Sequence, residues 1–249
     1  MQCDAISAPR TWADREAKVT GFRHRQRLAT TRSLDGPLGA YYRSMDPSPN
    51  VPTADWREAR FLCLDIETTG FDPKDDHLLS AGWIRVDNGS IDASSARHGF
   101  VTLENGAEVG QSAAIHRITD TDATEGRPAG EVLNAILNDL SGRILVCHFA
   151  QLEISFLDAI CRREWNQRFW PRQLVDTMQW HLDLRRRAWE PVEGDDLRLY
   201  TLIDNYGMPA TRPHDGLSDA FATAMLLLAM AQRDHRIATL ESLLDKRSW

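Results

Sequence analysis

The sequence predicts an α/β protein in which helices flank a mixed β-sheet, preceded by an N-terminal helical extension. An Asp-Asn-Gly hairpin signal at 87–89 lies between two strand-like segments and indicates antiparallel pairing. Farther along, apolar strand-like runs alternate with helical periodicities, a pattern typical of helices packed on a sheet. The 249 residues, 42% of them hydrophobic, suffice for one sizeable domain with an appendage or at most two small ones.

The expected strands begin near residue 60, where a mostly apolar segment ends at a Thr-Thr-Gly breaker. The first three strands should pair antiparallel. The fourth is a continuous apolar run, as expected of a buried strand parallel to its neighbour. The five expected strands are 61–67, 78–86, a third from Ile91 or Arg97 to Leu103, 143–148 and 174–176.

Helices are expected where apolar residues recur at helical spacing. Glycine followed by proline at 207–209 suits the end of one of them. The expected helices are 13–30, 111–115, 131–140, 152–163, 177–187, 197–206, 217–232 and 240–244.

Residues 1–55 differ from the rest and are interpreted as an extension and linker. The helix expected at 13–30 is basic, which is typical of a solvated face, with contact to nucleic acid or a partner as the alternative. Glycines and prolines between residues 36 and 52 read as a linker. We assign 56–235 to the main domain and 236–249 to a C-terminal helical tail.

Composition restricts the function classes. A formal net charge of −7 argues against a general basic surface for duplex DNA, but not against an enzyme whose bound metals receive a short single-stranded end. No apolar run reaches the roughly 18 residues of a membrane span, and the N-terminus lacks a signal-peptide pattern. Four cysteines without a CxxC pair favour a reduced, cytoplasmic protein.

Two acids stand at the end of the first strand. Side chains alternate along a strand, so Asp65 and Glu67 share one face. Neighbouring carboxylates repel each other and resist burial, and a divalent metal ion between them relieves both costs. The alternative to a metal site is a strand whose end is exposed at the protein surface, with both carboxylates in water.

Two later segments carry further candidates. Glu153 lies in the first turn of a helix that follows a strand, where ligand sites collect, although acids also complement the helix dipole there. Asp219 lies early in the helix at 217–232, and His214 lies on the loop before it. The pair combines a candidate metal ligand with an imidazole that titrates near neutral pH. A dipole-complementing acid and an exposed loop histidine are the alternatives.

In this order the three segments resemble the motifs of the DEDDh exonucleases, which include the proofreading epsilon subunit of bacterial DNA polymerase III and its DnaQ-like relatives. The segments read LDIETTG at 64–70, HFAQLEISFL at 148–157, and His214 through Asp219. The resemblance covers residues 60–232, and 115–119 is similar to the family's His-Gly-Ile segment. One departure is Glu153, where the family has aspartate.

The extra methylene of Glu153 requires its carboxylate to fold back to reach the same metal. Asp158 is no substitute, because it lies about 140° around the helix from Glu153. A second departure is Arg117, which replaces the glycine of the family's His-Gly-Ile segment and could alter contact with the terminal nucleotide.

The resemblance implies a ribonuclease H-like fold and a 3′–5′ exonuclease that hydrolyses single-stranded DNA with two Mg²⁺ or Mn²⁺ ions. Oxygen donors without cysteine suit these ions better than zinc. Asp65, Glu67, Glu153 and Asp219 are implied as the metal ligands, with Asp65 bridging both ions. His214 is implied as the general base that takes the proton of the attacking water.

The substrate contacts implied by the same motifs lie mainly on the tight turn after the first strand, where backbone N–H groups could meet the terminal nucleotide. Phe71 could stack against a base. Phe156 could instead pack in the core, and for the neighbouring Phe149 core packing is the favoured role. His116 could instead be a structural histidine. The candidates are Thr68, Thr69, Gly70, Phe71, His116 and Phe156.

Two other segments have structural interpretations beside functional ones. Asp176 is expected to cap the helix that follows it rather than to take part in catalysis. Cations and aromatics are mixed between residues 162 and 172, which suits either contact with a nucleic-acid strand or a packed helix end.

Two other functions compete with DNA hydrolysis. The same chemistry on RNA would depend on contacts with the 2′-hydroxyl, which the sequence does not reveal. A catalytically weak nucleic-acid-binding module is permitted by Glu153, whereas the four other motif residues argue against it. A DNA polymerase or another replication or repair protein is the expected partner, besides the nucleic-acid 3′ end.

Overall fold

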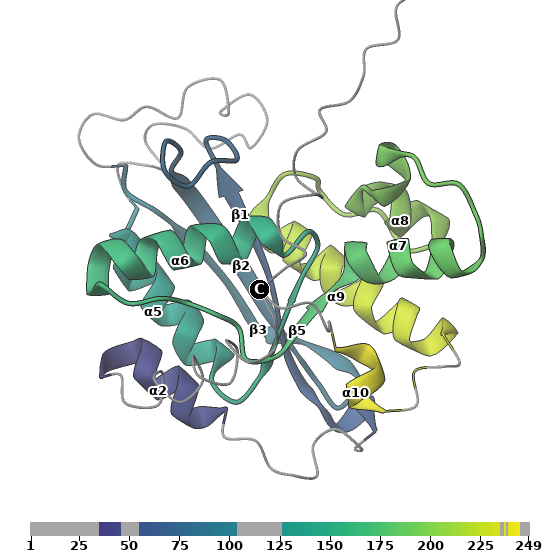
Figure 1. Ribbon diagram of the computed structural model, residues 1–249, viewed down its shortest axis with the longest axis horizontal. Helices are drawn as coiled ribbons and strands as arrows, with labels where there is room; N and C mark the ends of the chain where they lie inside the picture. Colours follow the sequence, from purple (N-terminus) through teal and green to yellow (C-terminus); the bar gives the residue numbers. More distant parts are fainter. Residues whose placement is uncertain (1–34, 46–54, 104–125, 235–236, 238, 245–249) are drawn as a thin grey trace, which may run out of the picture.

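The computed structural model describes residues 35–45, 55–103, 126–234, 237 and 239–244 (Figure 1). Its centre is a five-stranded sheet with the strand order β3-β2-β1-β4-β5. β1 pairs antiparallel with β2, and β2 with β3, whereas β4 and β5 run parallel to β1. The predicted mixed sheet is therefore confirmed. The strands are β1 (Arg60–Thr68), β2 (Leu78–Asp87), β3 (Ser90–Phe100), β4 (Ile144–Cys147) and β5 (Leu174–Asp176).

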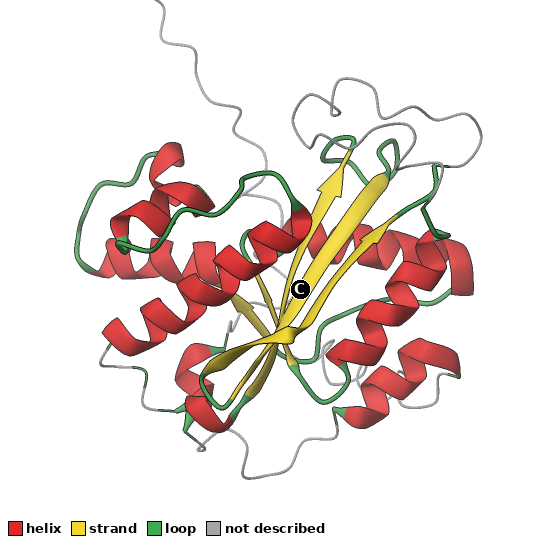
Figure 2. Cartoon of the chain, turned by 180° about the vertical axis from the view of Figure 1, so that it is seen from behind, coloured by secondary structure: helices red, strands yellow, loops and turns green. Residues whose placement is uncertain are grey.

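Helices cover both faces of the sheet (Figure 2). The predicted helices that fall on described residues agree with the structure to within a few residues, whereas α2 and the short 3₁₀ helices η2 and η4 were not expected. The predicted helices at 13–30 and 111–115 lie outside the described residues. The helical elements are α2 (Gly36–Ser44), η2 (Trp56–Glu58), α5 (Ala129–Leu140), α6 (Gln151–Trp165), α7 (Thr177–Arg187), η4 (Gly194–Leu197), α8 (Leu199–Asn205), α9 (Gly216–Arg233) and α10 (Leu240–Leu243).

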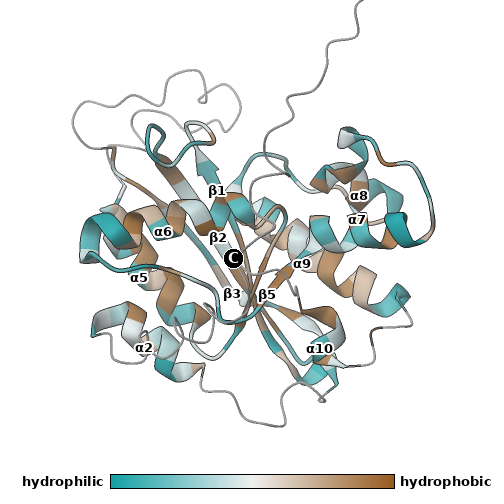
Figure 3. Ribbon diagram, in the orientation of Figure 1, coloured by the Kyte–Doolittle hydropathy of each residue, from teal (hydrophilic) through white to brown (hydrophobic). Residues whose placement is uncertain are grey.

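The alternation of side chains along β1 separates two hydrophobic layers. Leu62 and Leu64 are buried in the layer that contains α5 and α6. Phe61 and Cys63 are buried in the layer that contains α9. Figure 3 shows the same arrangement as hydrophobic segments along the strands, α5 and α9. Each fully buried side chain of this size contributes about 1.5–3 kcal/mol, so the pattern fixes which face each β1 residue occupies.

Helix α2 corrects the interpretation of 36–44 as linker. Tyr41 and Tyr42 are buried in the same core as α5 and α6. The Tyr41 hydroxyl accepts a hydrogen bond from the backbone N–H of Arg172 at 3.0 Å, and the Tyr42 hydroxyl accepts one from Trp170 at 2.9 Å. The glycine-proline pair begins this helix, because proline is well tolerated in a first turn.

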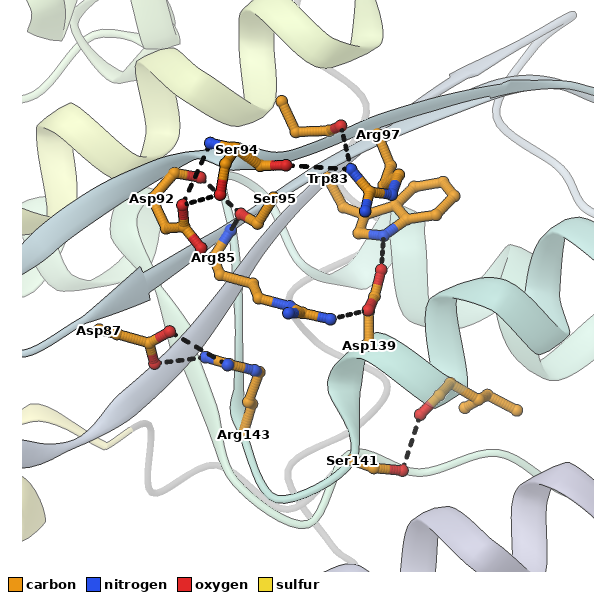
Figure 4. Close-up of polar contacts among 12 residues, drawn as sticks. Trp83, Arg85, Asp87, Asp92, Ser94, Ser95, Arg97, Asp139, Ser141 and Arg143 are labelled. Atoms are coloured by element: carbon orange, nitrogen blue, oxygen red, sulfur yellow. Dashed lines mark hydrogen bonds and ion pairs between the residues drawn. The ribbon is translucent and has the colours of Figure 1, made fainter.

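At the end of the sheet where β1 begins, partly buried charges are matched in pairs (Figure 4). The guanidinium of Arg143, only 4% exposed, donates to both carboxylate oxygens of Asp87 at 2.5 and 3.1 Å. Arg85 forms an ion pair with Asp139, which also accepts a hydrogen bond from the indole N–H of Trp83 at 2.8 Å. We call these five residues the paired-acid end.

Candidate active site

Three carboxylates converge where β1 ends. Asp65 and Glu67 come from β1, and Asp219 comes from the first turn of α9. One oxygen of each side chain lies within 4.8 Å of the other two. The three residues therefore converge as predicted, and we call them the carboxylate cluster. Figure 1 shows the first turns of α6 and α9 beside the end of β1.

Gly82 on β2 allows α9 to approach the sheet this closely. It pairs with Asp65 across the antiparallel ladder. A Cβ atom at this position would overlap the backbone of Gly216 and Leu217 at the start of α9. Gly82 was not among the residues predicted for the site, although a glycine inside an apolar strand signals close approach of another backbone.

Burial and mutual repulsion disfavour the charged forms of two acids of the carboxylate cluster, Asp65 and Asp219. Removal from water raises the pKa of Asp65, and the neighbouring charges of Asp219 and Glu153 raise it further. Burial is also the main cause that raises the pKa of Asp219 to about 6. In the described part of the chain, no arginine or lysine forms an ion pair with Asp65, Glu153 or Asp219. Hard oxygen donors lacking a positive partner fit a divalent cation such as Mg²⁺.

Glu153 approaches from the opposite helix layer. It lies in the first turn of α6, is 2% exposed, and stands outside the three-oxygen contact of the cluster. Burial raises its pKa, and the charge of Asp176 adds to that effect. Among the residues that the structure describes, its Oε2 atom has no hydrogen-bond donor. A buried carboxylate oxygen without a donor is costly, and a cation beside it would remove that cost.

Asp219 is held on both of its oxygens. The backbone N–H of His214 donates to its Oδ2 at 3.2 Å, and the hydroxyl of Tyr200 on α8 donates to its Oδ1. Thr211 donates in turn to the Tyr200 hydroxyl at 3.2 Å. Burial and the bond to Asp219 raise the pKa of Tyr200, which keeps the hydroxyl protonated as a donor. No sequence motif pointed to Tyr200.

His214 lies beside the cluster and is exposed. Its backbone adopts a φ of +60°, and its N–H is the donor to Asp219. The predicted base therefore stands on a loop that is anchored to one of the predicted metal ligands. The residue as a whole is exposed to solvent.

The loop that follows β1 forms the predicted tight turn. Thr69 donates its N–H to the His77 carbonyl at 2.9 Å and its hydroxyl to Asp76 at 3.1 Å. The Thr68 hydroxyl donates to the Gly70 carbonyl at 2.6 Å, so both threonine side chains are engaged within the loop. A side chain at Gly70 would overlap the Asp76 carboxylate, which explains the glycine.

The aromatic candidates divide differently from the prediction. Phe71 is 76% exposed, as a stacking residue requires. Phe156 is 2% exposed and packs in the core, so its predicted place in the substrate site is wrong. Phe149, expected in the core, is 42% exposed and lies between β4 and α6. The helical periodicity of α6 places Phe156 on the buried face of the helix. Phe149 precedes the helix, so this periodicity does not determine its orientation. His116 lies outside the described residues.

Two nearby acids have structural roles. Asp176 caps α7 by accepting the N–H of Gln179 at 3.1 Å, which confirms the expected cap. Asp158 accepts hydrogen bonds from Arg162 and Arg168 at 2.6 and 2.8 Å. Those two arginines thus belong to a packed helix end, one of the two interpretations of 162–172.

Comparison with known sequences decides the family. Residues 62–227 match the profile of the RNase T family, whose members are described as exonucleases. The chain belongs to this exonuclease family. The predicted identity as a DnaQ-like exonuclease is thereby confirmed, and the carboxylate cluster lies within the matched residues.

The exonuclease resembles one segment of much longer bacterial proteins. It is 28% identical over 188 residues to the PolC-type DNA polymerase III of Thermotoga maritima, covering 72% of this chain and 12% of that protein. The corresponding protein of Caldanaerobacter subterraneus is 25% identical over 179 residues, again covering 12% of its length. The chain therefore spans about an eighth of the curated relatives it matches.

Solved structures confirm the ribonuclease H-like fold. The nuclease domain of 3′hExo, a DEDDh family member bound to rAMP, superposes with a TM-score of 0.62 at 15% identity, covering 78% of this chain and 100% of that one. E. coli exonuclease I in complex with a dA16 oligonucleotide gives a TM-score of 0.59 at 17% identity, covering 72% and 42%. Within the described residues of the exonuclease, no helix has the length and apolar character needed to cross a membrane.

Proposed function

We propose that this exonuclease removes nucleotides one at a time from the 3′ end of single-stranded DNA, in a reaction that requires two Mg²⁺ or Mn²⁺ ions. The observation that carries the proposal is the carboxylate cluster, whose Asp65 and Asp219 have raised pKa values and form no ion pair with an arginine or lysine in the described chain. Such a cluster, inside an exonuclease-family segment, is suited to metal-assisted phosphodiester hydrolysis.

The placement of the acids supports the proposed metal ligands. Asp65, Glu67 and Asp219 would hold one ion, and Glu153 would serve the second from the α6 side. When bound, the ions would lower the pKa of the attacking water and neutralise charge on the phosphate and on the leaving 3′-oxygen.

The residues of the chain position the reactants and move the proton. His214 would accept the proton of the attacking water on its exposed ring, while its backbone N–H keeps the loop against Asp219. Attack at phosphorus breaks the bond to the 3′-oxygen and releases a nucleoside 5′-monophosphate. The turn at Thr68, Thr69 and Gly70 would contact the terminal nucleotide through its backbone, and Phe71 would stack on its base.

DNA is favoured as the substrate because the sequence relatives are PolC-type DNA polymerases. The same resemblance suggests a polymerase or another replication protein as a partner. RNA is the second candidate, because the similar 3′hExo nuclease domain is bound to rAMP. The two substrates differ by a 2′-hydroxyl, so they are separated by direct comparison.

The test uses 5′-labelled single-stranded DNA and RNA of one sequence, with Mg²⁺, with Mn²⁺ or with chelator. We expect a ladder of products shortened from the 3′ end, formed faster on DNA and abolished by chelator. Asp65→Asn is the control for a contaminating nuclease and should show no cleavage. A protein that binds DNA yet cleaves neither polymer with either metal is a binding module, and the proposal is then wrong.

A further inference from the structure

Phe149 combines an unfavourable backbone conformation with an exposed aromatic ring. Its φ is +76°, a region that bulky residues avoid because the Cβ atom crowds the backbone. The ring is nevertheless 42% exposed, so core packing does not account for phenylalanine here. Strained residues of this kind concentrate at functional sites.

A buried carboxylate imposes this conformation. Asp176 accepts the N–H of Phe149 at 3.3 Å on one oxygen and the N–H of Ala150 at 3.2 Å on the other. The first of these oxygens also caps α7 through Gln179. The β4–α6 turn is thus fixed by a buried residue of the next strand, and the ring of Phe149 projects from a rigid support.

The turn lies at the same edge of the sheet as the carboxylate cluster. β4 is parallel to β1, with Cys63 paired to Val146. If this register is extended by two residues, Asp65 lies opposite residue 148. Phe149 is the next residue of the chain and therefore lies near the cluster end of β1. Glu153 comes one helical turn later in α6. Phe71 after β1 and Phe149 after β4 therefore extend from neighbouring strands.

We propose that Phe149 is a specificity residue that stacks on an unpaired base of the substrate and thereby selects single-stranded ends. The inference rests on the proposed function and adds a second aromatic contact to Phe71. A base inside a duplex has both faces covered by neighbouring base pairs, so it reaches the ring only after it is unpaired and unstacked, which a single strand permits at lower cost than a fully paired 3′ end. Loss of one stacked base weakens binding roughly 5- to 150-fold.

Asparagine is the informative substitution because it tolerates a positive φ and has no ring. Phe149→Asn should fold at least as stably as the wild type. A matched control exists in Trp189, which is also exposed and has a φ of +57° but lies beyond the end of α7. Phe149→Trp should retain the contact.

Binding of a fluorescein-labelled single-stranded oligonucleotide is measured by anisotropy with Ca²⁺ in place of Mg²⁺, and cleavage is measured with Mg²⁺. We expect Phe149→Asn to raise Kd and KM at least fivefold with kcat nearly unchanged, and Trp189→Asn to change neither. A second set of oligonucleotides carries one abasic site each, at the last, second-last or third-last position. For the wild type, one of these three should weaken binding as much as Phe149→Asn weakens binding of the intact oligonucleotide. At that position Phe149→Asn should cause no further loss.

The outcomes separate the two proposals. If the wild type cleaves the oligonucleotide but Phe149→Asn binds and cleaves it equally well, the stacking role is overturned and the exonuclease proposal stands. If Phe149→Asn weakens binding equally at every abasic position, the ring contacts no single base, which also overturns it. A wild type that neither binds nor cleaves overturns both.

Discussion

The acids near the two ends of the central strand differ in their charge partners. At the paired-acid end, Asp87 is joined to Arg143 and Asp139 to Arg85 (Figure 4). At the other end, Asp65 and Asp219 approach each other with no arginine or lysine beside them in the described chain. The fold thus supplies arginines where acids are structural. We propose that a cation from solution completes the carboxylate cluster at the opposite end.

The energetic consequence differs accordingly. A partly buried ion pair that loses one partner leaves a charge without compensation, which destabilises the fold. Removing one charge from a set of repelling carboxylates relieves the fold and harms only the function. Four variants can break or sharpen this contrast.

Asp65→Asn should have the largest effect. It should lower kcat/KM at least about 100-fold, because one ligand oxygen and one charge are lost at the reacting phosphate. Its free energy of unfolding without metal should equal or exceed that of the wild type. Asp87→Asn, at the other end of the same antiparallel pair, should show the reverse: normal cleavage and lower stability in urea denaturation.

The pH dependence of stability should reveal Asp219. Its pKa is about 6 in the folded protein, against about 4 when unfolded. The folded state therefore binds more protons between these values, and metal-free protein should lose about 2 kcal/mol of stability as pH rises from 4 to 6. Urea midpoints measured across this range would show it. Asp219→Asn should remove that part of the slope; an unchanged slope would contradict the raised pKa.

Arg143→Met should cost about 2 kcal/mol of unfolding free energy, less than a fully buried pair because Asp87 can reach water. Cleavage should be unchanged. Arg57→Met, which removes an exposed pair with Asp55, is the matched control and should change stability by less than about 0.5 kcal/mol. Equal effects of the two substitutions would mean that burial of the pair is unimportant.

Tyr200→Phe should have the smallest effect, about a tenfold loss of kcat/KM and of Mn²⁺ affinity, because only the support of Asp219 is lost. Tyr206→Phe on the neighbouring segment is the control. Mn²⁺ binding followed by electron paramagnetic resonance distinguishes a positioning role from general damage. Unchanged Mn²⁺ affinity in a folded Tyr200→Phe protein would exclude that role.

The sequence could predict the features that follow from local periodicity. Alternation along β1 placed Asp65 and Glu67 on the face where α9 packs, and helix spacing placed Asp219 in a first turn. The parallel run of β4 beside β1 then brought Glu153 toward the same edge of the sheet.

Features that depend on contacts between distant segments could not be predicted. Tyr200 became a partner of Asp219 only through the packing of α8 on α9. The α2 segment resembled a linker because the sequence does not show what buries its tyrosines. Their hydrogen-bond partners are separated from them by 126 to 131 positions in the chain. Phe149 is exposed and Phe156 is buried, the reverse of the prediction, because the backbone of Phe149 is held by a bond to Asp176 that the local sequence does not reveal.

The most direct test of the central claim, that a divalent cation completes the carboxylate cluster, is thermal unfolding of wild type and Asp65→Asn with and without excess Mn²⁺. A cation that binds the folded state alone must raise its unfolding temperature. We expect a higher Tm with Mn²⁺ for the wild type and no increase for Asp65→Asn. Equal behaviour of the two proteins would contradict a metal site at the cluster.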